Sequence, residues 1–274
     1  MTVRAVLPRD PAGAARALLP IVLVLLAAAI GETRLAVLVA LVAGTLVAIR
    51  RQAPVRWAWA GPVPVAVSLA FGLIPPPSAD PTGLDCASIT SPPAVWRVLE
   101  AILVLGVLGF LAILLRAPAA SLWLRRPSSR TILLSLAGFG LFAVLGLAVG
   151  PTLARPFFGA FGLDTSDPLT LLPALVFALA NGIMEELAYR GALMGWSARV
   201  IGLVPAVVLQ AIVFGLAHGG PDIIAGALPL TAALALGGLL AGIVAIRTRS
   251  LLLPIAIHVA LDLPLYVYLA CRTV

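Results

Sequence analysis

Residues 168–190 read PLTLLPALVFALANGIMEELAYR, and this stretch decides the class of fold. No charged residue occurs in it before Glu185, and a helix of this length is sufficient to cross a hydrocarbon core of about 30 Å. The same segment ends with Glu185, Glu186 and Arg190, which are side chains that a bilayer tolerates poorly. It therefore predicts a membrane helix that also carries chemistry.

Similar apolar segments recur along the chain, which is 62% hydrophobic and only 11% charged, with a mean hydropathy of +1.13. Soluble domains contain about 25% charged residues. We therefore predict an all-α, polytopic helical membrane protein with about eight or nine transmembrane helices and the lipid bilayer as its solvent. The nine candidate segments are residues 17–31, 35–49, 57–74, 94–115, 131–151, 168–190, 203–219, 222–246 and 251–270. The first two are short, so a hairpin or a re-entrant pair fits them equally well.

The basic residues explain the net charge of +7 without a nucleic-acid partner. With nine spans and a cytoplasmic N-terminus, a few arginines fall outside, at Arg34, Arg97, Arg155 and Arg272. A larger group falls inside: Arg4, Arg9, Arg16, Arg50, Arg51, Arg56, Arg116, Arg125, Arg126, Arg130, Arg199, Arg247 and Arg249. This bias follows the positive-inside rule. All the basic residues are Arg and none is Lys, a usage that points to a bacterium and hence to its inner (plasma) membrane.

Residues 1–30 allow a second interpretation, a cleaved signal peptide, because arginines precede an apolar stretch that ends in small residues. Apolar segments follow immediately, which favours a retained anchor. We expect residues 1–164 to form N-terminal transmembrane helices and loops, and residues 165–274 to form a catalytic membrane core. The sequence makes no prediction of oligomeric state.

Ionisable groups gather in the last third of the chain. Glu185, Glu186 and Arg190 lie in one segment, His218 in the next, and both His258 and Asp262 in the last segment; the two histidines are all that the chain contains. Each charge at the centre of a membrane helix costs about 2.5–3.5 kcal/mol, so such a cluster requires partners or a function.

Helical spacing indicates which of these groups face one another. Glu186 and Arg190 are four residues apart, so we expect a structural ion pair. Glu185 points about 100° away from Glu186, so we do not expect its carboxylate to join that ion pair. His258 and Asp262 are also four apart, so the carboxylate can orient the imidazole. A desolvated carboxylate beside imidazoles can activate water, and an imidazole can protonate a leaving amine or donate to an oxyanion. A carboxylate and two imidazoles with these roles suit the hydrolysis of an amide bond.

The motifs EELAYRG at 185–191, FGLAH at 214–218 and HVALD at 258–262 resemble, in order and spacing, EExxxR, FxxxH and HxxxN/D of the CPBP family of CAAX proteases and bacteriocin-processing membrane proteins. The resemblance covers roughly residues 165–270. It implies a metal-independent intramembrane glutamic endopeptidase, a hydrolase without cofactor, that cleaves a peptide or membrane-protein substrate.

By that resemblance the catalytic residues are Glu185, His218, His258 and Asp262. Glu185 with His218 would activate the water, and His258 with residue 262 would form the oxyanion site; Glu186 and Arg190 would support the first motif. Position 262 departs from the Asn of the eukaryotic-type enzymes. Because an ionised Asp cannot donate a hydrogen bond to an oxyanion, its role is to orient His258 unless it is protonated.

Two other readings use the same residues. Glu185, His218 and His258 could bind Zn²⁺ with water as the fourth ligand, although the chain has no HExxH motif. A transporter or non-catalytic peptide-binding scaffold, as in bacteriocin self-immunity, also uses intramembrane charges, but the concentration of these groups in the last third favours an enzyme. Asn181, Tyr189 and Gln210 are interpreted as interhelical hydrogen-bonding residues outside the site.

The catalytic interpretation requires the side chains of Glu185 and His218 to lie close together in the fold. Glu185 lies near the inner end of its segment, whereas His218 lies late in a segment that enters from inside. The two can meet when the first-motif helix continues beyond Arg190 towards Arg199. Their side chains must then lie within about 8 Å, since catalytic groups act through hydrogen bonds or one shared water.

Overall fold

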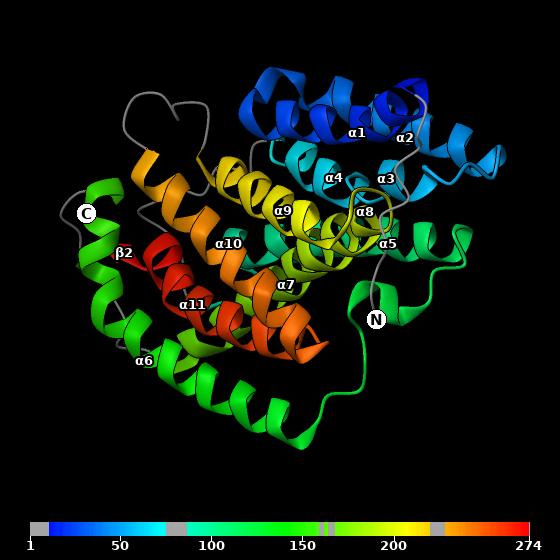
Figure 1. Cartoon of the computed structure of the whole chain (residues 1–274). Coiled ribbons are helices and arrows are strands. Elements are labelled where there is room, and N and C mark those ends of the chain that lie inside the picture. The colour runs from blue at the N-terminus through cyan, green and yellow to red at the C-terminus, as the bar shows by residue number, and fades with distance from the viewer. Residues whose placement is uncertain (1–10, 75–86, 159–161, 164–167, 220–227, 274) are drawn as a thin grey trace. The chain divides into compact units, whose positions relative to one another are not determined.

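A computed structural model describes residues 11–74, 87–158, 162–163, 168–219 and 228–273. Nearly all of this chain is helical (Figure 1). The start of the predicted segment at residue 222 and the predicted domain boundary at residues 164 and 165 lie outside the described residues. The α-helices are α1 (Pro11–Ala29), α2 (Arg34–Arg50), α3 (Arg56–Ala60), α4 (Val63–Phe71), α5 (Pro92–Leu114), α6 (Ser129–Phe158), α7 (Leu171–Glu185), α8 (Gly195–Ile201), α9 (Leu203–His218), α10 (Leu228–Thr248) and α11 (Leu252–Ala270).

Shorter elements complete the described chain. There are 3₁₀ turns at η1 (Gly31–Thr33), η2 (Ala119–Leu122) and η3 (Pro168–Thr170), and a π-helix at η4 (Glu186–Met194). Strands β1 (Gly162–Leu163) and β2 (Arg272–Thr273) pair in antiparallel register.

Five segments of the described chain are long and apolar enough to cross a membrane. They are Gly31–Arg50, Pro92–Leu114, Ser129–Gly150, Pro168–Ile201 and Leu228–Thr248. Three shorter apolar helices accompany them: Gly13–Ala29, Leu203–His218 and Leu252–Tyr268. The prediction of an all-α, polytopic helical membrane protein is confirmed.

One predicted segment takes a different form. Residues 57–74 were expected to make a single span, but they form the two short helices α3 and α4, with a break at Gly61 and Pro62. Proline has no backbone N–H and cannot continue the hydrogen-bond ladder of α3. Most of α4 is buried, so its apolar side chains pack mainly against protein.

The described chain forms two compact units. Unit 1 comprises Met1–Ile74, Leu103–Arg126 and Glu185–Leu251, and unit 2 comprises Pro75–Ile102, Pro127–Met184 and Leu252–Val274. Within unit 1, α9 packs closely along α10. The close approach depends on glycine, because a Cβ at Gly238 would lie 3.2 Å from the Cα of Ala211. Buried Gln210 then donates its Nε2 to the Gly238 carbonyl at 2.8 Å, which confirms its interpretation as an interhelical residue.

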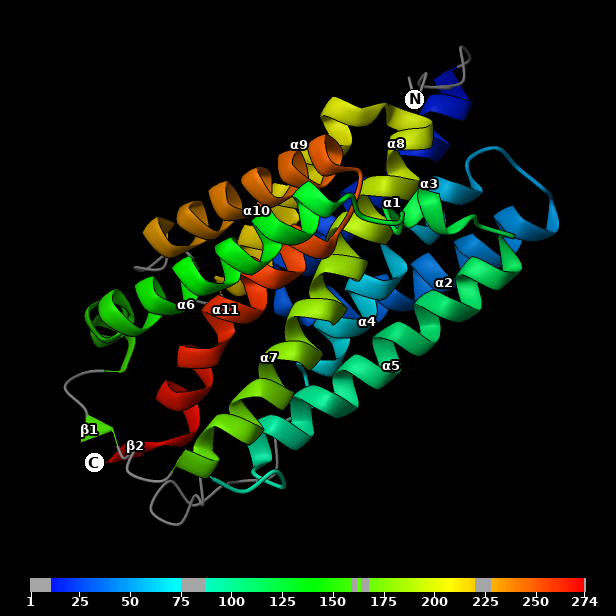
Figure 2. The ribbon, with the colours of Figure 1, turned by 90° about the horizontal axis from the view of Figure 1, so that it is seen from below.

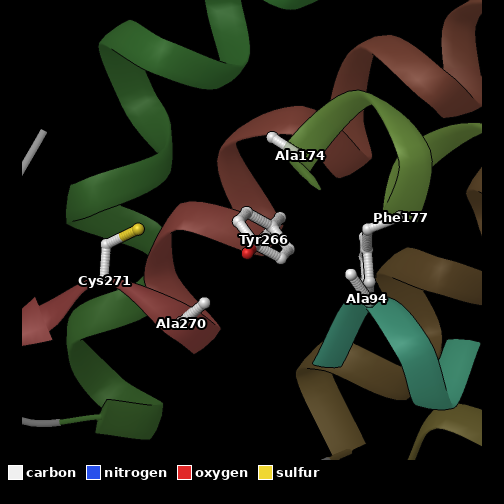
Figure 3. Close-up of a cluster of buried hydrophobic side chains, with 6 residues drawn as sticks. All are labelled: Ala94, Ala174, Phe177, Tyr266, Ala270 and Cys271. Carbon is white, nitrogen blue, oxygen red and sulfur yellow. The ribbon is translucent and has the colours of Figure 1, made fainter. Parts of the chain in front are cut away.

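Unit 2 is organised around α11. Helices α6 and α11 run side by side in both ribbon views (Figures 1 and 2). Figure 3 shows the ring of Tyr266 at the centre of a small core with Ala94, Ala174 and Phe177 around it. The Tyr266 hydroxyl and Ser91 Oγ form a buried hydrogen bond of 2.7 Å, so the polar end of the tyrosine is satisfied.

The glycine contact between α9 and α10 yields a stability prediction. A Cβ at Gly215 would lie 2.5 Å from the Thr231 carbonyl oxygen and 2.8 Å from Ala235 Cβ, whereas a Cβ at Gly237 meets nothing within 4 Å. We expect Gly215→Ala to destabilise the protein by about 1–3 kcal/mol through overpacking. Gly237→Ala should be neutral or stabilising by up to about 1 kcal/mol through helix propensity. Thermal unfolding of both variants in detergent checks this, and equal melting temperatures would contradict it.

Candidate active site

The helix of the first motif does not end at Arg190. Helix α7 is followed directly by the π-helix η4 and then by α8, so helical structure continues to Ile201. The expected continuation beyond Arg190 to Arg199 is therefore confirmed. The π-helix itself was not predicted, because no local sequence pattern distinguishes it. Such wide turns are rare and are frequently found at functional sites.

Within unit 1, the continued helix brings Glu185 and His218 together. Glu185 Oε2 lies 3.7 Å from His218 Nε2, well within the separation that a shared water requires. The Glu185 side chain is 8% exposed, and that of His218, at the end of α9, is 31% exposed. The carboxylate is thus nearly buried while its imidazole partner is accessible.

The backbone determines which nitrogen of His218 faces the carboxylate. His218 Nδ1 lies 2.8 Å from the carbonyl oxygen of Phe214. A carbonyl only accepts, so Nδ1 carries a proton and donates it. In the neutral imidazole, Nε2 then bears the lone pair and faces Glu185 as an acceptor. Two acceptors 3.7 Å apart can both accept from one water that lies about 2.8 Å from each.

Glu186 and Arg190 form the expected ion pair. Glu186 Oε1 lies 2.9 Å from Arg190 Nη1, and the two side chains are 1% and 2% exposed. The Arg190 guanidinium also lies over the Phe214 ring, 4.3 Å from its centroid. Phe214 in turn contacts the His218 ring at 4.5 Å between centroids and the Tyr189 ring at 5.1 Å. Phe214 therefore links the buried ion pair to the imidazole, a role that its place in the motif did not reveal.

Within unit 2, α11 carries the second candidate pair. His258 Nε2 lies 3.6 Å from Asp262 Oδ2, and both side chains are mostly buried. Asn181 on α7 donates Nδ2 to the same Asp262 oxygen at 2.8 Å. This hydrogen bond confirms the interpretation of Asn181 as an interhelical residue. Its acceptor is a candidate catalytic carboxylate, and no sequence pattern indicated that pairing. A Cβ at Gly182 would lie 2.9 Å from Val259 Cγ2, so glycine at this position lets α7 approach α11.

The two pairs lie in different units, Glu185 with His218 in unit 1 and His258 with Asp262 in unit 2. Taken alone, the described residues of neither unit contain a group of three or more His, Cys, Asp or Glu side chains that could hold a metal ion. The zinc reading needs ligands from both units and stays a hypothesis.

The fold and these buried polar pairs define a class, the polytopic helical membrane proteins with ionisable groups inside membrane segments. Residues 167–264 match the family model described as type II CAAX prenyl endopeptidase Rce1-like. The match covers the stretch that carries all three motifs, so the predicted resemblance to the CPBP family is confirmed, and it supports an intramembrane protease. Comparison with curated proteins finds no match. Comparison with solved structures finds none either.

The Glu186–Arg190 pair yields a double-mutant prediction. Arg190→Met should destabilise the protein by about 3–5 kcal/mol, because it leaves a buried carboxylate without its cation. Glu186→Leu combined with Arg190→Met replaces both charges by apolar groups and should recover most of that loss. Thermal unfolding of both proteins in the same detergent measures the difference. A double variant that is as unstable as the single one would show that the pair is not the interaction that Arg190 provides.

Proposed function

We propose that the protein is a metal-independent intramembrane glutamic endopeptidase that hydrolyses a peptide bond in a peptide or membrane-protein substrate. The observation that carries the proposal is the nearly buried Glu185 carboxylate, 3.7 Å from an imidazole whose Nδ1 is held by a backbone carbonyl. The family match supports the class of reaction. We also propose that residues 1–164 form N-terminal transmembrane helices and loops, and that residues 165–274 form the catalytic core.

In the first step Glu185 accepts a proton from the water that it shares with His218 Nε2. The oxygen of that water bonds to the carbonyl carbon of the substrate, and the C=O electron pair moves to the carbonyl oxygen. Because Glu185 is a general base and not a nucleophile, no covalent acyl-enzyme forms. His218 orients the water, since its Nε2 accepts a hydrogen bond from the second O–H of the water.

In the second step the tetrahedral intermediate collapses. The C=O bond re-forms, the C–N bond breaks, and the amine leaves with the proton that Glu185 returns to it. The products are an amine and a carboxylic acid, and the acid then loses the second water proton to solvent to become a carboxylate. The resemblance assigns stabilisation of the oxyanion to His258. Asp262 accepts a hydrogen bond from Asn181, so we assign it the role of orienting His258 and not that of an oxyanion donor.

The substrate class follows from family and sequence together. The matched family is named for endopeptidases that act on prenylated CAAX proteins. The Lys-free, Arg-rich composition points instead to a bacterial plasma membrane, where such substrates are not expected. We therefore propose a peptide or membrane-embedded protein substrate of bacterial origin.

Loss of the general base provides the first test. Glu185→Gln keeps the shape of the side chain but cannot accept the proton, so cleavage of a peptide library by the purified protein should fall by about 10²-fold or more. Glu100→Gln removes another buried carboxylate, in α5, and should leave cleavage nearly unchanged. A Glu185→Gln variant with full activity would refute the proposal.

The same assay tests metal independence. Cleavage should persist in a strong chelator, because no step requires a Lewis acid. Activity that is lost in chelator and restored by added Zn²⁺ would support the zinc alternative with the same residues.

Asn181 gives a separate prediction about positioning. Asn181→Leu removes the donor to Asp262, and a hydrogen bond to a charged group contributes about 1.5–3 kcal/mol. We expect kcat to fall about tenfold or more with little change in KM. Gln210→Leu removes a comparable buried interhelical amide in unit 1 and should lower thermal stability without a selective loss of kcat. Equal effects of the two variants on kcat would indicate a purely structural role for Asn181.

A further inference from the structure

The guanidinium groups of two arginines in unit 1 lie over the same tryptophan ring. The guanidinium carbon of Arg199, on α8, lies 4.1 Å from the centroid of the Trp57 ring. That of Arg56, at the start of α3, lies 5.8 Å from the same ring. The buried indole of Trp196 packs edge-on against Trp57 at 6.0 Å, so the platform under the two cations is held in place. Neither arginine is used by the proposed chemistry.

Among the described residues of unit 1, no carboxylate forms an ion pair with either of these arginines. Arg56 Nη1 donates to the Gln52 carbonyl at 3.0 Å, and neither arginine forms an ion pair within the described residues. The acidic side chains among the described residues of unit 1 are Glu32, Glu185 and Glu186. Glu32 precedes α2, about 25 Å from the Arg50 end of that helix. The other two belong to the candidate active site. A guanidinium that rests on an aromatic face keeps N–H groups at its edge for another acceptor.

The position of this pair along the membrane segments indicates the ligand. Arg199 lies in the last turn of the candidate span Pro168–Ile201, and α3 packs against both α8 and α2, whose span ends at Arg50. Ends of spans lie at the depth of lipid headgroups, where tryptophan and arginine are enriched. Arg50 and Arg51 add exposed positive charge at the end of α2. Anionic phospholipid headgroups lie at this depth and attract basic residues near the membrane surface.

We propose that Arg56 and Arg199, supported by Trp57, form a binding site for the phosphate of an anionic phospholipid headgroup. Guanidinium groups bind phosphate oxygens through paired N–H donors, and each basic residue at a membrane surface adds a favourable interaction with anionic lipid. The site lies within unit 1 and does not depend on peptidase activity. Its expected preference is for phosphatidylglycerol over phosphatidylcholine with the same acyl chains.

Lipid titration of the purified full-length protein in neutral detergent, followed by native mass spectrometry, tests the site. The wild type should bind phosphatidylglycerol at least about tenfold more tightly than phosphatidylcholine. Arg56→Gln with Arg199→Gln should weaken phosphatidylglycerol binding roughly 25-fold, at about fivefold for each guanidinium lost. Arg116→Gln with Arg247→Gln removes the same charge from two exposed helix-end positions and should change binding about twofold or less, because exposed charges are screened by solvent and salt.

Additional lipid-binding comparisons show which results would overturn the proposed site. Equal binding of the two lipids by the wild type, or an equal effect of the two double variants, would overturn the site. Inorganic phosphate at the same concentration should not displace the lipid, and full displacement would show that the ligand is a free anion. Arg56→Lys with Arg199→Lys keeps both charges and should retain a preference for phosphatidylglycerol. Loss of that preference in a lysine variant that elutes as a folded protein in gel filtration would also overturn the proposal.

Discussion

The buried ion pair between Glu186 and Arg190 is the interaction on which the candidate site depends. Two full charges in side chains that are at most 2% exposed persist because each neutralises the other. The guanidinium also lies over Phe214, and Phe214 holds His218 through its backbone carbonyl and its ring. A pair that performs no chemistry in the proposed mechanism thereby positions the imidazole that does.

Both candidate acid–base pairs follow one physical rule, in which a reactive side chain is oriented by a partner that is itself held by the fold. His218 donates Nδ1 to the carbonyl of the residue one turn earlier, which leaves Nε2 for the carboxylate side. Asp262 accepts from Asn181 on another helix of unit 2, where glycine at position 182 permits the close approach. Where the surroundings are nearly dry, as at Asp262, such a hydrogen bond fixes the rotamer more firmly than it would in water.

For two of the arginines we propose a second role beside the expected one of orienting the chain. Positive-inside bias requires basic residues near the ends of spans but does not require them to share an aromatic platform. Arg56 and Arg199 do share one, on Trp57, and this arrangement extends the argument from topology to recognition of the membrane surface. The burial of Trp196 beneath that platform suggests why a large aromatic residue occupies the interior of α8.

Sequence spacing was sufficient to predict a contact between two side chains where both lie on the same helix. The Glu186–Arg190 and His258–Asp262 contacts follow from a spacing of four residues, and the helical class follows from long apolar segments, because helix periodicity and bilayer thickness are local constraints. The expectation that the first-motif helix extends towards Arg199 followed from the depths of Glu185 and His218 in their predicted segments. The catalytic roles of Glu185, His218, His258 and Asp262 stay predictions.

Tertiary structure decided every feature that involves residues from different helices. The 3.7 Å approach of Glu185 to His218 and the hydrogen bond from Asn181 to Asp262 arise from helix packing, which sequence spacing does not encode. The break between α3 and α4 and the π-helix at Glu186–Met194 likewise appeared only in the fold. Short apolar segments look alike whether they face lipid or protein, and a π-turn forms where neighbouring elements stabilise it. The sequence alone thus determined the membrane class and the pairs within helices, whereas packing inside each unit determined which residues of different helices meet.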